Sequence, residues 1–157
     1  MSKATEDFRK AALGSIGEKV VGNHYARTGA MVLYSEDTYD EHKDITINDV
    51  TTQVKTRVPV MKEKAFCFTE KEMASIMRAE QAFIVTVPIP SLDKFNKYGG
   101  YVYKLDTKNM VTRVSTKDVF TGQIAIDIDQ PALEPIKRIE DEKLLKRMME
   151  LSTSKWN

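Results

Sequence analysis

Two short segments of alternating polarity flank a turn in the stretch DITINDVTTQVKTR, which runs from Asp44 to Arg57. Asn48 and Asp49 lie between the segments, and both residue types tolerate the positive φ that a two-residue hairpin turn requires. The pattern therefore predicts two antiparallel strands, with Asp44 directly opposite Gln53 and the two side chains on one face of the sheet.

The same alternation gathers polar side chains on one face of this hairpin. Lys55 follows Gln53 by two residues, so the two side chains share a face. The other face carries the apolar side chains of Ile45, Ile47, Val50 and Val54. A slip of one residue would move one polar set to the wrong face, so the predicted register is specific. The hairpin is thus expected to bring a carboxylate, an amide and an ammonium group together.

Such a cluster has the chemistry of a divalent-metal site. Carboxylate and amide oxygens are the hard ligands that Mg²⁺ or Mn²⁺ prefers, and Mg²⁺ often takes only one or two protein carboxylates. A lysine beside the metal can stabilise the charge that develops on a phosphate or position the attacking water. Glu18, directly after Gly17 in a helix expected to pack on this sheet, is a candidate further ligand.

The remaining elements place the hairpin in a larger sheet. The sequence predicts a helix over 5–27, a buried strand over 31–34, strands over 44–47, 50–58 and 82–87, a helix capped by Thr69, a second hairpin of segments 101–106 and 110–115, and a charged helix from Pro135 to about Leu151. Glycines at 14 and 17 weaken the middle of the first helix, which predicts a break or close packing there. This order is typical of an α/β domain around one mixed sheet.

Composition sets the limits on fold and function classes. The 157 residues predict a single domain, with a core over about 5–90 and a C-terminal elaboration over about 91–157. Lys and Arg total 24 against 23 Asp and Glu, which argues against a histone-like basic protein. The single cysteine, Cys67, excludes a disulfide framework and a Cys-rich zinc site, and we expect it to be buried as a small hydrophobe. No apolar run is long enough to span a membrane and no signal-peptide core follows the N-terminus, so we expect a soluble cytoplasmic protein.

The same residues resemble the PD-(D/E)XK nuclease superfamily, and more closely its Mrr-like and archaeal Holliday-junction-resolvase-like branches. The matching positions are Gly17-Glu18, Gly29, Asp44-Ile45 and Gln53-Val54-Lys55-Thr56, within about Ser15 to Arg57. The resemblance implies a restriction-endonuclease-like αβββαβ core. It also implies that Glu18, Asp44 and Gln53 surround a divalent metal while Lys55 assists hydrolysis.

Two positions depart from the pattern of this superfamily. Gln53 stands where most members carry Glu or Asp, which removes one anionic ligand, although the Mrr-like branch accepts Gln. Lys43 stands before Asp44 where Pro is common. Each residue also has an ordinary reading by itself: Glu18 as a solvated helix residue, Gln53 as an exposed polar group, and Asp44 with Lys55 as a surface ion pair. Their joint order and spacing favour the nuclease.

We therefore expect a Mg²⁺- or Mn²⁺-dependent DNA endonuclease that hydrolyses phosphodiester bonds, acts as a homodimer and selects branched DNA structures. A restriction or repair nuclease, an RNA nuclease, and a catalytically inactive nuclease fold that binds nucleic acid or a protein partner are the alternatives. Phosphate contacts are predicted for the basic residues Arg57, Lys62, Lys64 and Lys97. The alternative for each of these is a charge that serves solubility alone.

Overall fold

A computed structural model describes residues 3–34, 45–60, 64–88 and 100–152. The elements are α1 (Lys3–Ala26), β1 (Val32–Leu33), β2 (Ile45–Ile47), β3 (Val50–Arg57), β4 (Ala65–Phe68), α2 (Glu70–Arg78), β5 (Gln81–Thr86), β6 (Tyr101–Leu105), β7 (Thr112–Val114), the 3₁₀ helix η1 (Asp118–Phe120), β8 (Ile124–Asp127), β9 (Leu133–Arg138) and α3 (Glu142–Ser152). The protein is a mixed α/β fold with a mixed central sheet and a C-terminal helix, which confirms the predicted fold class.

The predicted hairpin is present with the predicted register. Asn48 and Asp49 take φ values of 50° and 66°, the left-handed conformation of a type I′ turn. Ile45 lies opposite Thr52, so the strands pair without a slip in the described residues. The Asn48 side chain also accepts a hydrogen bond of 2.9 Å from the Met31 amide, which ties the turn to the strand before it. Local turn chemistry and alternation were therefore sufficient to predict this unit.

The central sheet has six strands in the order β1-β2-β3-β5-β6-β9. β3 and β5 are parallel, and α2 lies in the crossover between them, while every other neighbouring pair in this sheet is antiparallel. A second, three-stranded sheet has the order β4-β8-β7. Two of its strands, β4 and β8, lie outside the strands that the sequence predicted.

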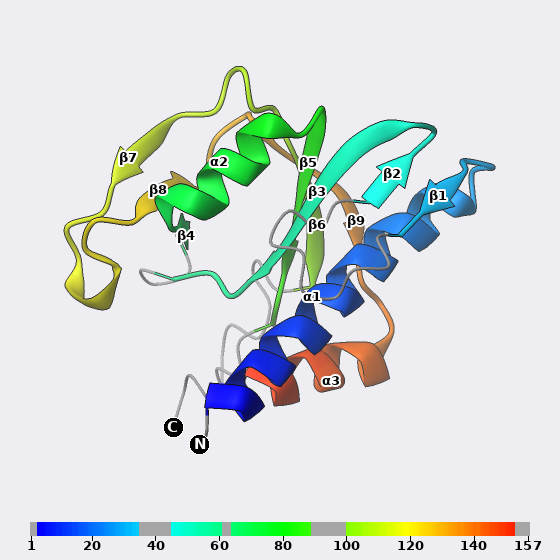
Figure 1. Ribbon diagram of the computed structural model, residues 1–157, viewed down its shortest axis with the longest axis horizontal. Coiled ribbons are helices and arrows are strands. Elements are labelled where there is room, and N and C mark those ends of the chain that lie inside the picture. Colours follow the sequence, from blue (N-terminus) through cyan, green and yellow to red (C-terminus); the bar gives the residue numbers. More distant parts are fainter. Residues whose placement is uncertain (1–2, 35–44, 61–63, 89–99, 153–157) are drawn as a thin grey trace.

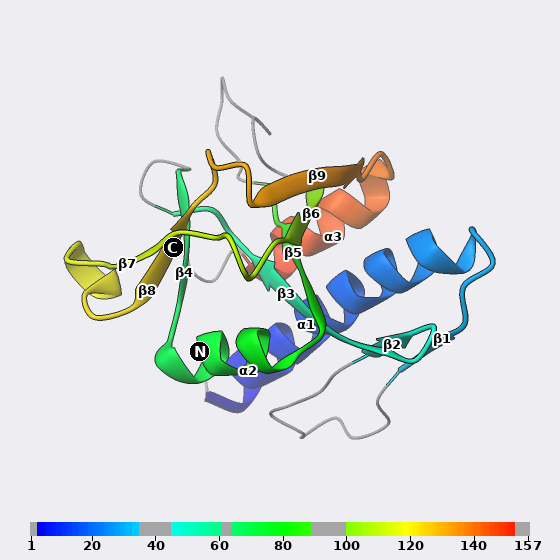
Figure 2. The ribbon, with the colours of Figure 1, turned by 90° about the horizontal axis from the view of Figure 1, so that it is seen from above.

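Helices cover both faces of the central sheet (Figures 1 and 2). On one face α1 and α3 pack together over a core that includes Val21, Ile45 and Phe83. On the other face α2 and the small sheet enclose a second core that includes Phe66 and Ile84. The hairpin strands β2 and β3 thus lie between a layer of two helices, α1 and α3, and a layer formed by α2 and the small sheet.

Strand β1 forms at the edge of the central sheet and not in its core. Leu33 is 57% exposed and Met31 is 64% exposed, so the prediction of a buried strand over 31–34 was wrong. β1 pairs only with β2 among the described strands, and its position at the end of the sheet order leaves one side open to solvent. A short apolar run indicates a strand but does not indicate how central that strand is.

The predicted second hairpin was also wrong, although both of its segments are strands. The turn between them is present. The Met110 amide donates a 2.9 Å hydrogen bond to the Asp106 carbonyl oxygen, and the Asn109 side-chain amide donates a 2.7 Å hydrogen bond to the Asp106 carboxylate. However, β6 pairs with β5 and β9 in the central sheet, whereas β7 pairs with β8 in the small sheet. The two strands separate after the turn because each finds its partner elsewhere.

Pro135 was predicted to open the C-terminal helix, and instead it lies within β9. It is opposite Tyr103 next to a register shift in an edge strand, where the missing amide hydrogen of proline is tolerated. The helix begins seven residues later in the chain, at Glu142. The Asp141 carboxylate accepts hydrogen bonds from the amides of Lys143 and Leu144 at 3.1 and 3.2 Å, which caps this helix.

Candidate functional site

A glycine brings α1 into direct contact with β3. A Cβ atom added at Gly17 would overlap the Thr56 hydroxyl and lie 3.2 Å from Thr56 Cβ. The hydroxyl oxygen Oγ1 of Thr56 is buried and makes no hydrogen bond within the described residues, so it serves this contact as a packing group. The next residue, Glu18, is only 7% exposed. The predicted close packing at this glycine is therefore confirmed, and it sets the Glu18 backbone against the strand.

Strand β3 carries the other predicted site residues on its opposite face. Its alternation directs Thr52, Val54 and Thr56 toward the α1 face, and Gln53 and Lys55 toward the α2 face. Gln53 is 3% exposed and Lys55 is half-buried. The two residues pair in register with Ala82 and Ile84 of β5, which belong to the core beneath α2. The predicted sharing of one face by Gln53 and Lys55 is therefore correct.

Glu18 thus approaches the same stretch of β3 from the α1 face, while Gln53 and Lys55 project toward the α2 face. The described part of β2 ends at Ile45, opposite Thr52, so it does not extend alongside this stretch. Asp44, the remaining predicted ligand, lies outside the described residues. Among the described residues no group of three or more His, Cys, Asp or Glu gathers into a metal site. The described part of the site is one carboxylate, one amide and one ammonium group.

Tyr34 is a neighbour of this site that the sequence did not indicate. A Cβ added at Gly22 would overlap its hydroxyl and lie 2.8 Å from its Cζ, so the phenol is seated directly on α1. Partial burial raises the pKa of the Tyr34 hydroxyl, and the negative charge of Glu18 raises it further. Gly22 is the local feature of the sequence that permits this contact. The residues around Gly22 do not indicate that Tyr34 is the side chain that fills the space.

Arg57, a predicted phosphate contact, is engaged by the protein itself. Its guanidinium forms an ion pair with Glu72 of α2 and lies 5.2 Å from the centre of the Phe68 ring. Burial lowers the pKa of Arg57 to about 10. The other Glu72 carboxylate oxygen accepts a 3.0 Å hydrogen bond from the Thr69 amide, and Thr69 caps the Glu72 amide in return. This capping box joins the end of β3 to the start of α2.

Of the three lysines that were also predicted to contact phosphates, the structure describes one. Lys64 is exposed next to β4. Lys62 and Lys97 lie outside the described residues.

Cys67 is buried at 9% exposure, as predicted, and burial raises the pKa of its thiol, which disfavours the nucleophilic thiolate.

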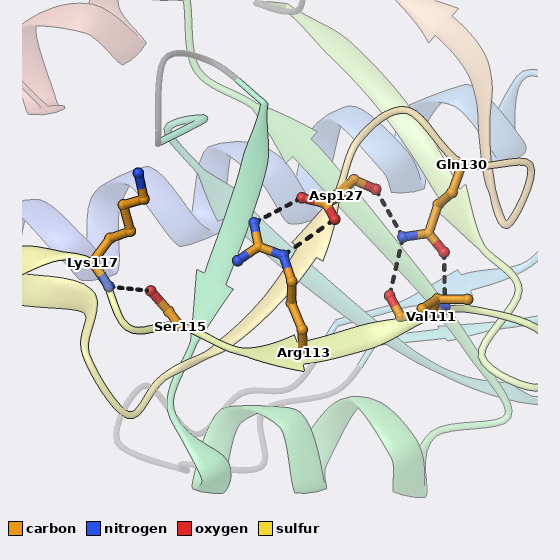
Figure 3. Close-up of polar contacts among 6 residues, drawn as sticks. All are labelled: Val111, Arg113, Ser115, Lys117, Asp127 and Gln130. Atoms are coloured by element: carbon orange, nitrogen blue, oxygen red, sulfur yellow. Dashed lines mark hydrogen bonds and ion pairs between the residues drawn. The ribbon is translucent and has the colours of Figure 1, made fainter.

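A second polar cluster lies on the small sheet (Figure 3). Arg113 of β7 donates two hydrogen bonds to Asp127 of β8, at 2.9 and 3.2 Å. This pairing lowers the pKa of the Asp127 carboxyl. The Gln130 side chain accepts from the Val111 amide at 2.8 Å and donates to the carbonyl oxygens of Val111 and Asp127 at 3.1 and 2.8 Å. These hydrogen bonds hold β7 and β8 together, so we assign this cluster a structural role.

Comparisons with known proteins add little to this site. The chain is similar to the Matrix protein 1 of Dhori virus (strain Indian/1313/61), with 29% identity over 80 residues. That match covers 48% of this chain and 30% of the viral protein, so it spans less than a third of the relative's length. No family model matches the chain, and no solved structure matches it. No helix among the described residues has the length and apolar character needed to cross a membrane.

Proposed function

We propose that this protein is a metal-dependent DNA endonuclease that hydrolyses phosphodiester bonds. The observation that carries the proposal is the Gly17–Thr56 contact, which sets Glu18 against the stretch of β3 that bears Gln53 and Lys55. The described residues of the pattern that resembled a nuclease motif, Glu18, Gln53 and Lys55, therefore belong to α1 and β3, which pack against each other.

The chemistry of these groups fits a divalent cation of the Mg²⁺ or Mn²⁺ type. Glu18 and Gln53 present oxygen donors that are almost removed from solvent, and Mg²⁺ needs few protein ligands when phosphate and water complete its shell. Gln53 and Asp44 would hold the ion from one face of the sheet, and Glu18 would have to reach it past the edge of β3 beyond Thr52, which the described part of β2 does not cover. The ion would supply Lewis-acid activation of water and of the phosphate. The Lys55 ammonium would stabilise the negative charge that develops on the phosphate or orient the attacking water.

The proposed substrate is branched DNA, cut by a two-fold homodimer as in a Holliday-junction resolvase. Such a dimer would place two copies of one site on two strands of a junction. A restriction-type or repair nuclease would use the same chemistry on a different DNA. DNA contacts by Lys62, Lys64 and Lys97 belong to this proposal. Arg57 would first have to leave Glu72 to join them.

Cleavage of labelled duplex, single-stranded and four-way-junction DNA, with Mg²⁺ or Mn²⁺, tests the activity and ranks the substrates. We expect metal-dependent cutting by the wild-type protein and its loss in Asp44→Ala and Lys55→Ala. Lys117→Ala is the matched lysine control, because Lys117 is exposed beside the small sheet. Cutting that persists in both site variants, or no cutting of any substrate, would contradict the proposal.

The second candidate is a nuclease fold that binds nucleic acid or a protein without cutting, and Gln53 favours it. An amide at a position that is 3% exposed removes one anionic ligand from the proposed site. Gln53→Glu separates the two candidates. In a working metal site the new carboxylate should strengthen Mn²⁺ binding. In an inactive site it would bury a negative charge, at a cost on the order of several kcal/mol that Mn²⁺ does not relieve.

A further inference from the structure

We propose that the end of the central sheet formed by β6 and β9 binds unstacked nucleobases of single-stranded DNA (Figure 2). The site consists of Arg138 over the ring of Tyr101 and of an open cavity beside Tyr103. The inference rests on the proposed function in one respect, namely that the ligand is DNA. It does not depend on the proposed metal site, because the buried Ile84 lies between Lys55 and Tyr103 in the register of the sheet.

A guanidinium group lies over a tyrosine ring at this end of the sheet. Arg138 of β9 pairs in register with Tyr101 of β6, and its Cζ lies 5.7 Å from the centre of the Tyr101 ring. This is the distance of a cation–π contact, which holds the guanidinium on the ring. Tyr101 is itself packed against the core, whereas Arg138 is exposed. Nucleobases stack on arginine guanidinium planes as well as on aromatic rings, so Arg138 offers a cationic surface for one base.

An open cavity of about 390 Å³ adjoins this pair. One wall is the ring of Tyr103, whose centre lies 6.1 Å from that of the Tyr101 ring. The prolines at 131 and 135 add apolar walls, and the exposed Asp129 adds a carboxylate. An aromatic wall suits the face of a base, and a carboxylate accepts hydrogen bonds from the exocyclic amino group of cytosine. The cavity therefore fits a second base, with a preference for cytosine.

The spacing of the two positions favours single-stranded over duplex DNA. Tyr101 and Tyr103 are two residues apart on one strand, so their side chains share a face and lie about 6–7 Å apart along it. Successive bases of a duplex strand are stacked about 3.4 Å apart, which is roughly half that distance. A DNA strand can therefore place neighbouring bases at both positions only when they are unstacked, as in single-stranded segments and at branch points.

The same edge is poorly suited to a peptide that adds a strand to the sheet. β9 pairs only with β6 among the described strands, and an added strand would need backbone donors along its other side. Pro135 lies within β9, and a proline in an edge strand directs its nitrogen, which carries no hydrogen, to the open side. The edge therefore favours a ligand recognised through its bases over one recognised through its backbone.

Fluorescence anisotropy of labelled oligodeoxycytidine, with EDTA present to prevent cleavage, measures this binding by the full chain. We expect the wild-type protein to bind the single strand more tightly than a duplex of the same length. Arg138→Lys keeps the positive charge but removes the planar surface, and it should weaken single-strand binding by about 10-fold, as expected for the loss of one base stack. Arg147→Ala is the control, because it removes an exposed arginine from α3 on the opposite face of the sheet. Its affinity should not change.

Two further variants test the ring and the cavity. Tyr101→Leu keeps an apolar side chain at this position but removes the aromatic ring, and it should weaken binding in the same direction as Arg138→Lys. Asp129→Ala removes the acceptor in the cavity, so the ratio of affinities for oligodeoxycytidine and oligodeoxythymidine should fall. The ratio is the readout because the loss of a negative charge raises both affinities.

Wild-type affinity for the single strand in Arg138→Lys, or an equal loss in Arg147→Ala, would overturn this site. A wild-type protein that cleaves DNA with Mg²⁺ but binds the single strand no more tightly than the duplex would overturn the site and leave the proposed nuclease standing. A wild-type protein that neither binds nor cleaves any DNA would overturn both.

Discussion

The contact between Gly17 and Thr56 predicts that one methyl group on α1 will separate the helix from β3. The perturbation is Gly17→Ala, whose Cβ would overlap the Thr56 hydroxyl. Gly14→Ala is the matched control, because it makes the same chemical change in the same helix with no atom within 4 Å of the new Cβ. The two variants share the gain in helix propensity and differ in the steric term.

The structure allows the magnitude to be worked out. Gly→Ala in an open helix interior stabilises by about 1 kcal/mol, which is the expected effect at position 14. Forcing a methyl group into a packed interface costs about 1–3 kcal/mol, which outweighs that gain at position 17. We therefore expect Gly17→Ala to unfold with a free energy about 2 kcal/mol below that of Gly14→Ala. For a chain of this size, this corresponds to a melting temperature lower by about 4–8 °C.

Urea unfolding of the two variants, alone and with Thr56→Ala, measures this difference. Thr56→Ala removes both the overlapping hydroxyl and a buried methyl group, so its effect should be about 1 kcal/mol more favourable in Gly17→Ala than in Gly14→Ala. The relief of the overlap is partial because the Thr56 Cβ remains 3.2 Å from the added methyl group. If Gly17→Ala stabilised the protein as much as Gly14→Ala, or if Thr56→Ala had the same effect in both variants, the close contact that positions Glu18 would be refuted.

Three further predictions concern the contacts around this site and on the small sheet. Glu72→Gln keeps the capping box but removes the ion pair with Arg57, and should destabilise by up to about 1 kcal/mol, whereas Glu72→Ala should lose about 1 kcal/mol more in urea unfolding. The pairing with Arg113 lowers the folded-state pKa of Asp127 below its usual 3.8, so its stabilisation is present at neutral pH and is lost as the pH falls below that value. Wild type and Asp127→Asn should therefore converge in melting temperature on acidification. Gln130→Ala removes three hydrogen bonds and should speed amide exchange at the β7–β8 end, with a loss of about 1–2 kcal/mol in unfolding.

Some features could be predicted because their causes are local in the chain. The turn at Asn48 and Asp49 needs two residues that tolerate positive φ, and it lies between segments that alternate with period two. The α2 helix begins at a capping box whose partners, Thr69 and Glu72, are three residues apart. The sharing of one face by Gln53 and Lys55 needs only the alternation of a strand.

Other features depended on partners that are distant in sequence. Pro135 is tolerated in β9 because that strand lies at the edge of the sheet, and its own neighbourhood resembles a helix start. The strands on either side of the Asp106 turn separate because each pairs with a strand from another part of the chain.

The amino-acid sequence by itself therefore determined the hairpin, the two flanking helices and the identity of the polar residues on β3. The tertiary structure alone decided that α1 packs on the face of β3 opposite to the Lys55 side chain, that Arg57 forms an ion pair with α2, and that Tyr34 occupies the space left by Gly22. The physical reason is steric. A missing side chain leaves room for any neighbour of suitable shape, and only the folded chain determines which neighbour occupies that room.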